Sequence, residues 1–205
     1  MALIFVRHGS TELNAGDPKD KKDYFRGWTD APLSDFGRKT IKQTAAWFKP
    51  LKIDKLYSSD LPRAVETAQM ISKVTNNKVE PDKRLRPLDV GYLTAQLITP
   101  EGKKVLEESH RNKDEPIPGG ESYNDFIDRY TDILPDLLKE SKDKNVVVVT
   151  HHRNLLALPH LFFGKPLKVK GPPEPGGIMT LTDKGIHVLY VPPAVASVYN
   201  EHASS

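Results

Sequence analysis

Short runs of apolar residues along the chain alternate with longer segments in which apolar residues recur at helical spacing. The apolar runs are bounded by polar residues or turn formers and cover residues 2–6, 53–57 and 146–149. Continuous runs of this length are typical of strands that are buried on both faces of a parallel sheet. They predict three strands near the centre of such a sheet.

The segments between these runs have the apolar spacing of amphipathic helices, and each follows a residue that can cap a helix. They cover residues 36–48 after Ser34, 62–74 after Asp60 and 126–138 after Ser122. Pro62 falls in a first helical turn, where its missing N–H costs nothing, whereas Pro135 falls late and is expected to kink or end its helix. A shorter helix is expected to begin at Thr99 and Pro100.

Near the end of the chain, residues 178–182 and 186–191 flank Asp183, Lys184 and Gly185, which predicts a hairpin at one edge of the sheet. Because strands and helices otherwise alternate, we expect an α/β protein. The expected fold is a three-layer α/β/α sandwich with a mostly parallel central sheet and a C-terminal edge hairpin. Residues 1–191 would form a single domain, followed by a flexible tail at 192–205.

Composition narrows the range of functions. The chain has no cysteine, which excludes disulfides, a thiolate nucleophile and cysteine-based metal sites. Its net charge is only +3, and no basic run with interleaved aromatic residues suggests nucleic-acid binding. The apolar N-terminal run is too short for a signal peptide and leads directly into Arg7 and His8. We therefore expect a cytoplasmic protein with neither nucleic acid nor a membrane as partner; a homodimer is left open.

Polar side chains with catalytic potential follow each predicted central strand. Arg7 and His8 follow the first, Arg63 begins the helix after the second, and His151 and His152 follow the third. The carboxyl ends of parallel strands meet at one edge of a sheet, where open α/β sheets bind ligands. A neutral imidazole is a competent nucleophile toward phosphorus, and guanidinium groups can bind phosphoryl oxygens with two parallel hydrogen bonds. The sequence therefore favours phosphoryl transfer over an ordinary structural role for these residues.

Several blocks of the chain, in order and over nearly its whole length, resemble the histidine phosphatase superfamily, whose best-known branch is the cofactor-dependent phosphoglycerate mutases. The blocks are Arg7-His8-Gly9-Ser10 with Asn14, Gly27-Trp28-Thr29-Asp30 with Pro32-Leu33 and Gly37, Ser58-Ser59-Asp60-Leu61 with Arg63-Ala64 and Thr67-Ala68, Pro118-Gly119-Gly120-Glu121-Ser122, and Val149-Thr150-His151.

The resemblance implies a phosphatase that acts on a small phosphorylated metabolite through a phosphohistidine on His8. Arg7 and Arg63 would bind the phosphoryl oxygens, and His151 would stabilise charge in the transition state. No metal ion or other cofactor is expected, because arginines supply the positive charge and no P-loop or carboxylate cluster is present. The expected substrate-binding residues are Asn14, Arg26, Gly27 and His152.

The chain departs from the family pattern at the general acid. The family usually has a glutamate four residues before the glycine that corresponds to Gly91, and this chain has Pro87 there. Asp89 is the expected replacement, as a catalytic acid, although an aspartate before a glycine is also a common turn former. Without an acid, the enzyme should prefer leaving groups that depart unaided, such as acyl or aryl phosphates.

Two further departures lie at the expected pocket. His152 replaces a residue that is commonly glycine, and the stretch after Asn14 is longer than in the mutases and holds Lys19, Lys21 and Lys22. That stretch would form a cationic lid or, as charge runs more often do, an ordinary solvated loop. The alternatives left open are a phosphoglycerate-type mutase and a catalytically degenerate protein that binds phosphate or phosphoproteins.

Overall fold

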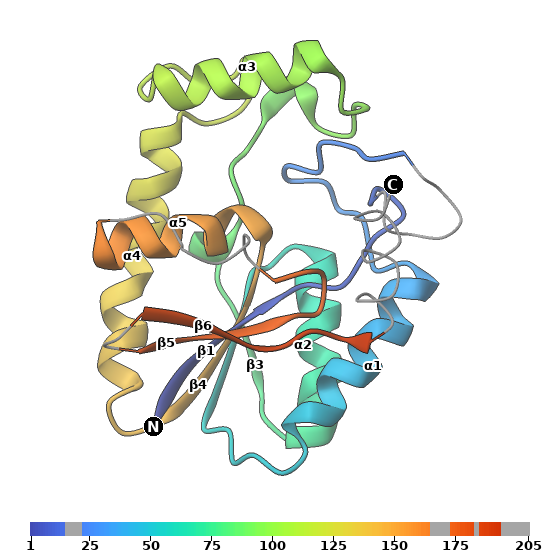
Figure 1. The fold of residues 1–205 in the computed structure, drawn as a ribbon, viewed down its shortest axis with the longest axis vertical. Helices are drawn as coiled ribbons and strands as arrows, with labels where there is room; N and C mark the ends of the chain where they lie inside the picture. Colours follow the sequence, from blue (N-terminus) through green and yellow to red (C-terminus); the bar gives the residue numbers. More distant parts are fainter. Residues whose placement is uncertain (15–21, 165–172, 183–184, 194–205) are drawn as a thin grey trace.

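A mixed sheet forms the centre of the computed structural model, which describes residues 1–14, 22–164, 173–182 and 185–193. Within these residues the sheet has six strands in the order β3-β2-β4-β1-β5-β6 (Figure 1). Their bounds are β1 (Ala2–Arg7), β2 (Lys55–Ser58), β3 (Val79–Pro81), β4 (Asn145–Thr150), β5 (Ile178–Thr182) and β6 (Gly185–Tyr190). The strand that opens the chain therefore lies in the interior of the sheet.

The strand directions agree with the prediction from sequence. β1 pairs in parallel with β4, β4 with β2, and β2 with β3. On its other side β1 pairs with β5, which runs antiparallel to it and to β6. The mostly parallel sheet and the C-terminal edge hairpin are thus confirmed, although residues 183 and 184 of the predicted turn lie outside the described part of the chain.

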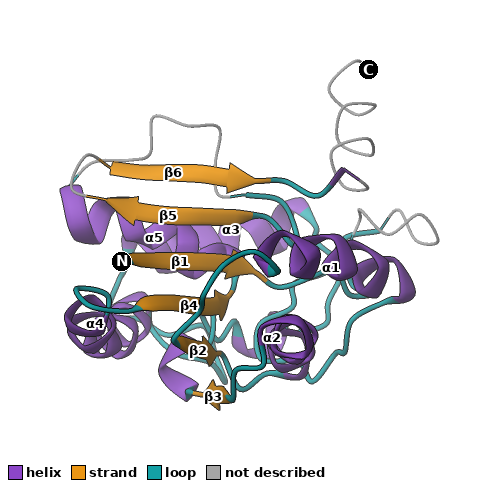
Figure 2. Ribbon diagram, turned by 90° about the horizontal axis from the view of Figure 1, so that it is seen from below, coloured by secondary structure: helices purple, strands orange, loops and turns teal. Residues whose placement is uncertain are grey.

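Helices cover both faces of the sheet, as Figure 2 shows from below. α1 (Asp35–Phe48) and α2 (Pro62–Thr75) pack on one face, and α4 (Tyr123–Glu140) and α5 (His152–Phe163) on the other. α3 (Pro100–Arg111) lies beyond the sheet, at the top of Figure 1. Two short 3-10 turns, η1 (Lys83–Leu85) and η2 (Gly91–Leu93), lie in the segment between β3 and α3. This arrangement is the expected three-layer α/β/α sandwich.

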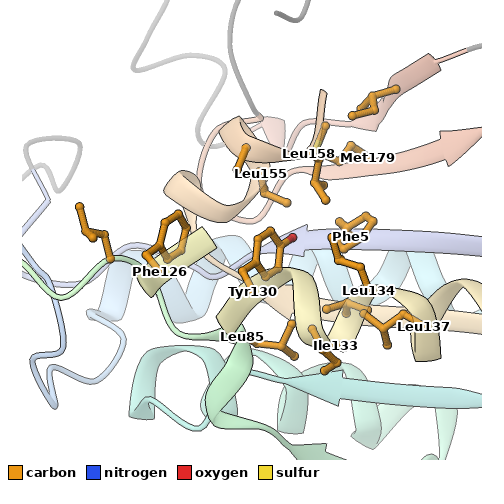
Figure 3. Packing of buried hydrophobic residues seen from close by; sticks show 14 of the residues in the cluster. Phe5, Leu85, Phe126, Tyr130, Ile133, Leu134, Leu137, Leu155, Leu158 and Met179 are labelled. Atoms are coloured by element: carbon orange, nitrogen blue, oxygen red, sulfur yellow. The ribbon is translucent and has the colours of Figure 1, made fainter. Parts of the chain in front are cut away.

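Successive residues of the central strands face opposite layers, as the twofold period of a strand requires. On β1, Ile4 and Val6 pack with α1 and α2, whereas Leu3 and Phe5 pack on the α4 and α5 side. Figure 3 shows Phe5 close to Tyr130 of α4, among the leucines of α4 and α5. A strand buried on both faces is apolar at every position, which explains the continuous run in the sequence.

Local capping signals predicted the helix starts well, with one exception. Ser34 accepts a hydrogen bond from the Gly37 N–H, Thr99 accepts one from Gly102, and Ser122 forms a capping box with its third-turn partner. The exception is Asp60, because the N-cap of α2 is Leu61. The Asp60 carboxylate instead accepts two hydrogen bonds from Arg86, at 2.6 and 2.7 Å.

Other expectations need correction or fall outside the description. Pro135 does not end α4, which continues to Glu140. The sequence gave no prediction of α5 or of the short β3. The predicted lid at 15–21 and the tail from residue 194 onward lie outside the described residues, so the domain limit at residue 191 stays a prediction. Among the described helices, none combines the length and apolar character needed to cross a bilayer.

Candidate active site

His8 and His151 are brought together because each follows one of two neighbouring parallel strands. Arg7, the last residue of β1, is in register with Thr150, the last residue of β4. The His8 backbone N–H then donates to the Thr150 carbonyl at 3.0 Å. The two imidazole rings lie 4.9 Å apart between centroids, at an interplanar angle of 62°. The predicted meeting of strand ends at one edge of the sheet is confirmed for this pair.

The His8 ring is held in one tautomer. Its Nδ1 lies 2.7 Å from the Gly9 carbonyl oxygen, and since a carbonyl can only accept, Nδ1 carries the proton. Nε2 therefore keeps its lone pair when the ring is neutral. Burial, followed by the positive charge of Arg63, holds the pKa of His8 well below its usual 6.5. The residue is thus a neutral imidazole at physiological pH, with a nucleophilic nitrogen.

Gly9 allows the backbone to pass close to α1. A side chain there would meet Ile41, since a Cβ on Gly9 would lie 2.6 Å from the Ile41 Cγ1. Its N–H donates to the Thr67 hydroxyl oxygen at 3.1 Å, and that hydroxyl donates to the Arg63 carbonyl at 2.8 Å. These contacts tie the turn after β1 to the first turns of α2 and fix His8 relative to Arg63.

Arg63 is a buried cation whose charge no carboxylate balances. Its side chain is almost fully enclosed, and its two terminal nitrogens each donate to a backbone carbonyl at 2.8 Å, those of Thr29 and Gly27. Its Nε has no hydrogen-bond partner among the described residues. Desolvation, followed by the nearby charge of Arg26, lowers the pKa of Arg63 to about 9. A phosphoryl group would supply the missing negative charge.

Arg7 and Arg26 add positive charge to the same region, but each already contacts an acid. Arg7 donates to the Pro173 carbonyl at 3.2 Å and lies 3.7 Å from the Glu174 carboxylate. Arg26 donates to the Asp23 carboxylate at 2.6 Å. Both side chains line the cavity described below. They therefore contribute to its potential without being as uncompensated as Arg63.

His151 is buried beside His8, and neither of its ring nitrogens has a hydrogen-bond partner among the described residues. Such orphaned nitrogens are uncommon in a folded interior and call for a ligand. Burial, and then the charge of Arg63, lowers the pKa of His151 well below 6.5. A neutral imidazole has one N–H to donate, which suits a phosphoryl oxygen.

A cavity of about 250 Å³ opens over these side chains. It is lined by Arg7, His8, Tyr24, Phe25, Arg26, Gly27, Arg63, Pro87, Leu88, Val90, Ile98, Lys103, Leu106, His151, His152 and Arg153. No carboxylate is among these described lining residues. A larger hollow of about 530 Å³ lies between Tyr57 and Glu140, away from the histidines. The smaller cavity is the candidate active site, since it alone contains the convergent groups described here.

Two of the predicted site residues do not reach this cavity. The Asp89 carboxylate accepts the Gly91 N–H at 3.1 Å, as in a turn, while Pro87 and Val90 line the cavity on either side of it. The Asn14 side-chain oxygen accepts from the backbone N–H and the hydroxyl of Thr11, at 2.9 and 3.0 Å. Both side chains thus support local backbone in this structure.

The other predicted residues do line the cavity, and the sequence analysis missed several more. Arg26 and Gly27 contribute to the wall, and His152 lies at the mouth with its ring exposed. The additional polar lining residues are Tyr24, Lys103 and Arg153. Arg153 follows His152 directly and could have been noticed, whereas Lys103 reaches the cavity only through the packing of α3.

The loop that carries Pro87 is held firmly in place. Trp28 donates from its indole nitrogen to the Pro87 carbonyl at 2.8 Å, and Arg129 donates to the same oxygen at 3.1 Å. The Arg86 guanidinium lies 4.6 Å from the centre of the Trp28 ring. Trp28 therefore packs under the loop, as expected of an aromatic residue at an element boundary. Within the described residues, no group of three or more acidic or histidine side chains is arranged to hold a metal ion.

Comparison with known proteins gives a consistent result. The profile described as "Histidine phosphatase superfamily (branch 1)" matches residues 3–171. Phosphoglycerate mutase-like protein 4 of Arabidopsis thaliana is 37% identical over 73% of this chain and 65% of its own length, slightly under two thirds. A probable phosphoglycerate mutase of Salmonella choleraesuis is 30% identical over 81% of this chain and 76% of its own. A mycobacterial glucosyl-3-phosphoglycerate phosphatase has the same fold, with a TM-score of 0.72 and 22% identity over 93% of this chain and 97% of its own.

Proposed function

The chain belongs to the histidine phosphatase superfamily, and from this premise we propose that it is a phosphatase that hydrolyses a small phosphorylated metabolite through a phosphohistidine on His8. The observation that carries the proposal is the pairing of a neutral His8, whose Nε2 lone pair is unused, with the uncompensated charge of Arg63. Both groups line the same cavity. A nucleophile and a phosphoryl-binding cation are the parts that the reaction needs.

The reaction has two steps. In the first, His8 Nε2 attacks phosphorus, a nitrogen–phosphorus bond forms, and the bond to the leaving oxygen breaks. Arg63, Arg7 and His151 bind the three non-bridging oxygens, whose charge is greatest in the transition state. In the second, water attacks phosphorus, its proton is lost to solvent, and inorganic phosphate leaves His8 as a neutral imidazole.

The leaving oxygen takes a proton or departs as an anion. Because the described cavity lining has no carboxylate and Pro87 stands at the family's glutamate position, we expect substrates whose leaving group departs unaided. Acyl and aryl phosphates are of this kind. The same charge argument makes metal ions unnecessary, so full activity is expected in chelator; a cytoplasmic location belongs to the proposal as well.

A phosphoglycerate-type mutase is the second candidate, and the printed names of the Arabidopsis and Salmonella relatives favour it. A mutase must protonate and deprotonate two substrate hydroxyls in turn, which is harder without an acid at Pro87. The two candidates differ in one measurement. A mutase interconverts phosphoglycerate isomers when primed with the bisphosphate, whereas a phosphatase releases inorganic phosphate.

The decisive experiment is hydrolysis of p-nitrophenyl phosphate in chelator by the wild type, His8→Ala and, as a matched control, His160→Ala. His160 is exposed on α5 and does not line the cavity. We expect turnover by the wild type and the control, none by His8→Ala, and a rapidly quenched phosphoprotein with its phosphate on His8. Turnover by His8→Ala would contradict the mechanism. A wild type inactive on a panel of acyl, aryl and alkyl phosphates would favour a non-catalytic binding protein.

A further inference from the structure

Ion pairing separates two arginines from all the others in the chain. Every other arginine lies within 4.0 Å of at least one carboxylate oxygen. Among the described residues, Arg63 and Arg153 form no such pair. Both line the same cavity. One of them has already been assigned to the phosphoryl group, which leaves the charge of Arg153 to be explained.

Arg153 is the second residue of α5, and its guanidinium contacts a histidine where an acid would be expected. Its Nη1 lies 3.1 Å from His110 Nε2, and the His110 ring packs edge-on against Tyr123 at 4.9 Å. Desolvation, and then the charge of Arg153, lowers the pKa of His110 to about 4. His110 is therefore neutral at pH 7 and accepts the arginine N–H without balancing its charge.

Burial makes this lack of compensation costly. Arg153 is partly enclosed, and desolvation lowers its pKa from the usual value. A charge that is partly removed from water and has no counter-ion destabilises the fold unless a ligand neutralises it. Proteins keep such residues mainly where they bind something. The arrangement resembles that of Arg63, which makes an anionic ligand the natural counterpart of Arg153.

Other features at this end of the cavity act in the same direction. Lys103 lies on the face of α3 that also carries Leu106 and His110, at the three- and seven-residue spacing of one helix face. Lys103 forms no ion pair among the described residues. The positive end of the α5 dipole adds to the potential there. With no carboxylate in the described lining, this whole region repels cations and attracts anions.

We propose that Arg153 and Lys103 form a second anion subsite, so that the substrate carries a carboxylate or a second phosphate besides the phosphoryl group that reacts at His8. The subsite rests on the proposed function for the identity of the reacting group. Arg153 positions the substrate and touches no reacting atom. The cavity of about 250 Å³ limits the molecule to a small metabolite with both anions on a short framework.

A binding experiment tests the subsite without requiring turnover. Calorimetry compares propylphosphonate with 3-phosphonopropionate and with propylene-1,3-bisphosphonate, which add a carboxylate or a second phosphonate. We expect the wild type to bind at least one of the dianionic ligands about tenfold or more tightly than propylphosphonate. Arg153→Gln should lose most of that preference. Arg111→Gln, a control on exposed α3 surface, should retain it. The ligand that is preferred identifies the second anion as carboxylate or phosphate.

A kinetic experiment separates failure of the subsite from failure of the proposed function. Phenyl phosphate and 4-carboxyphenyl phosphate are compared by the ratio of their kcat/KM values, in the wild type, Arg153→Gln and Arg111→Gln. We expect the ratio to fall several-fold in Arg153→Gln through KM and to stay unchanged in Arg111→Gln. Equal ratios in all three proteins, or no preference in calorimetry, would overturn the subsite even if both esters are hydrolysed. Preserved calorimetric preference without hydrolysis would overturn the phosphatase and leave the subsite standing.

Discussion

The imidazole rings of His8 and His151 lie edge to face, 4.9 Å between centroids, with both side chains buried. A proton on either ring would place a second positive charge beside Arg63, with no acid in the described cavity lining to offset it. The pair is therefore held neutral, and each ring favours the neutrality of the other. This relationship explains why a buried histidine pair can serve as nucleophile and hydrogen-bond donor.

Neutrality of His8 should persist into mildly acidic solution. Its pKa is depressed by burial and by Arg63, so the nucleophile stays unprotonated as the pH falls below the usual 6.5. We expect the ¹⁵N ring shifts of His8, assigned with His8→Asn, to keep the neutral pattern at pH 5.5. The kcat/KM value, corrected for the second ionisation of the substrate, should remain near its value at pH 7. Protonation of His8 with a midpoint at 6.5 or above would contradict the assignment.

Lysine should not replace Arg63. The guanidinium donates to the carbonyls of Thr29 and Gly27 at once and still presents Nε, whereas an ammonium group cannot span these positions. We expect Arg63→Lys to lower kcat/KM about a hundredfold or more, with little change in melting temperature. Arg38→Lys, at an exposed ion pair on α1, serves as control. A loss below tenfold would show that Arg63 does not bind the transferred group.

Asp89 has a backbone partner, and its substitution distinguishes a turn former from a general acid. Asp89→Asn keeps the hydrogen bond to Gly91 but removes an ionisable proton donor. From the position of the carboxylate, we expect similar and small losses on alkyl and aryl phosphates. A loss confined to alkyl phosphates, whose leaving groups need a proton, would restore the role of general acid that the sequence predicts for Asp89.

Restoring the family's acid should extend the substrate range. Pro87 lines the cavity, and its carbonyl is anchored by Trp28 and Arg129, so its replacement leaves the backbone contacts available. We expect Pro87→Glu to raise kcat/KM for alkyl phosphates roughly tenfold, a fraction of what an evolved general acid contributes. Pro87→Gln, equal in size but without a proton to give, should show no such gain. Equal behaviour of the two variants would mean that leaving-group protonation does not limit the rate.

Trp28 should contribute to stability through the loop that it supports. Trp28→Phe removes the hydrogen bond to Pro87 and weakens the contact under Arg86. We expect a loss of about 1–2 kcal/mol in the free energy of unfolding, measured by urea denaturation. Trp47→Phe is a suitable comparison because Trp47 packs on α1, away from the cavity. No loss in Trp28→Phe would indicate that the loop is held by Arg129 alone.

Features determined by neighbouring residues could be predicted from the sequence, and features determined by distant ones could not. The caps at Ser34 and Ser122 are local hydrogen bonds, so their pattern is visible in the sequence. Asp60 looks like another cap, but its carboxylate binds Arg86 from a different loop. α5 escaped prediction because polar residues open it and Pro159 lies within it.

The site shows the same division. Arg7, His8 and His151 could be placed because they directly follow strands whose ends must meet in a parallel sheet. Asp89 could not, since two residues of loop decide whether a side chain faces the cavity or the turn. Lys103 reaches the cavity from α3, a helix that packs beyond the sheet, and no local pattern records that packing.

The interior position of β1 governs when this protein becomes active during folding. The strand that delivers the nucleophile pairs with β4, whose register begins at Asn145, and with β5, which lies still later in the chain. Both pairings join distant parts of the chain, and such contacts form slowly. A nascent chain would therefore carry His8 from the start yet acquire a catalytic pocket only after β4 and α5 have emerged. Synthesis order itself thus delays activity until most of the fold exists.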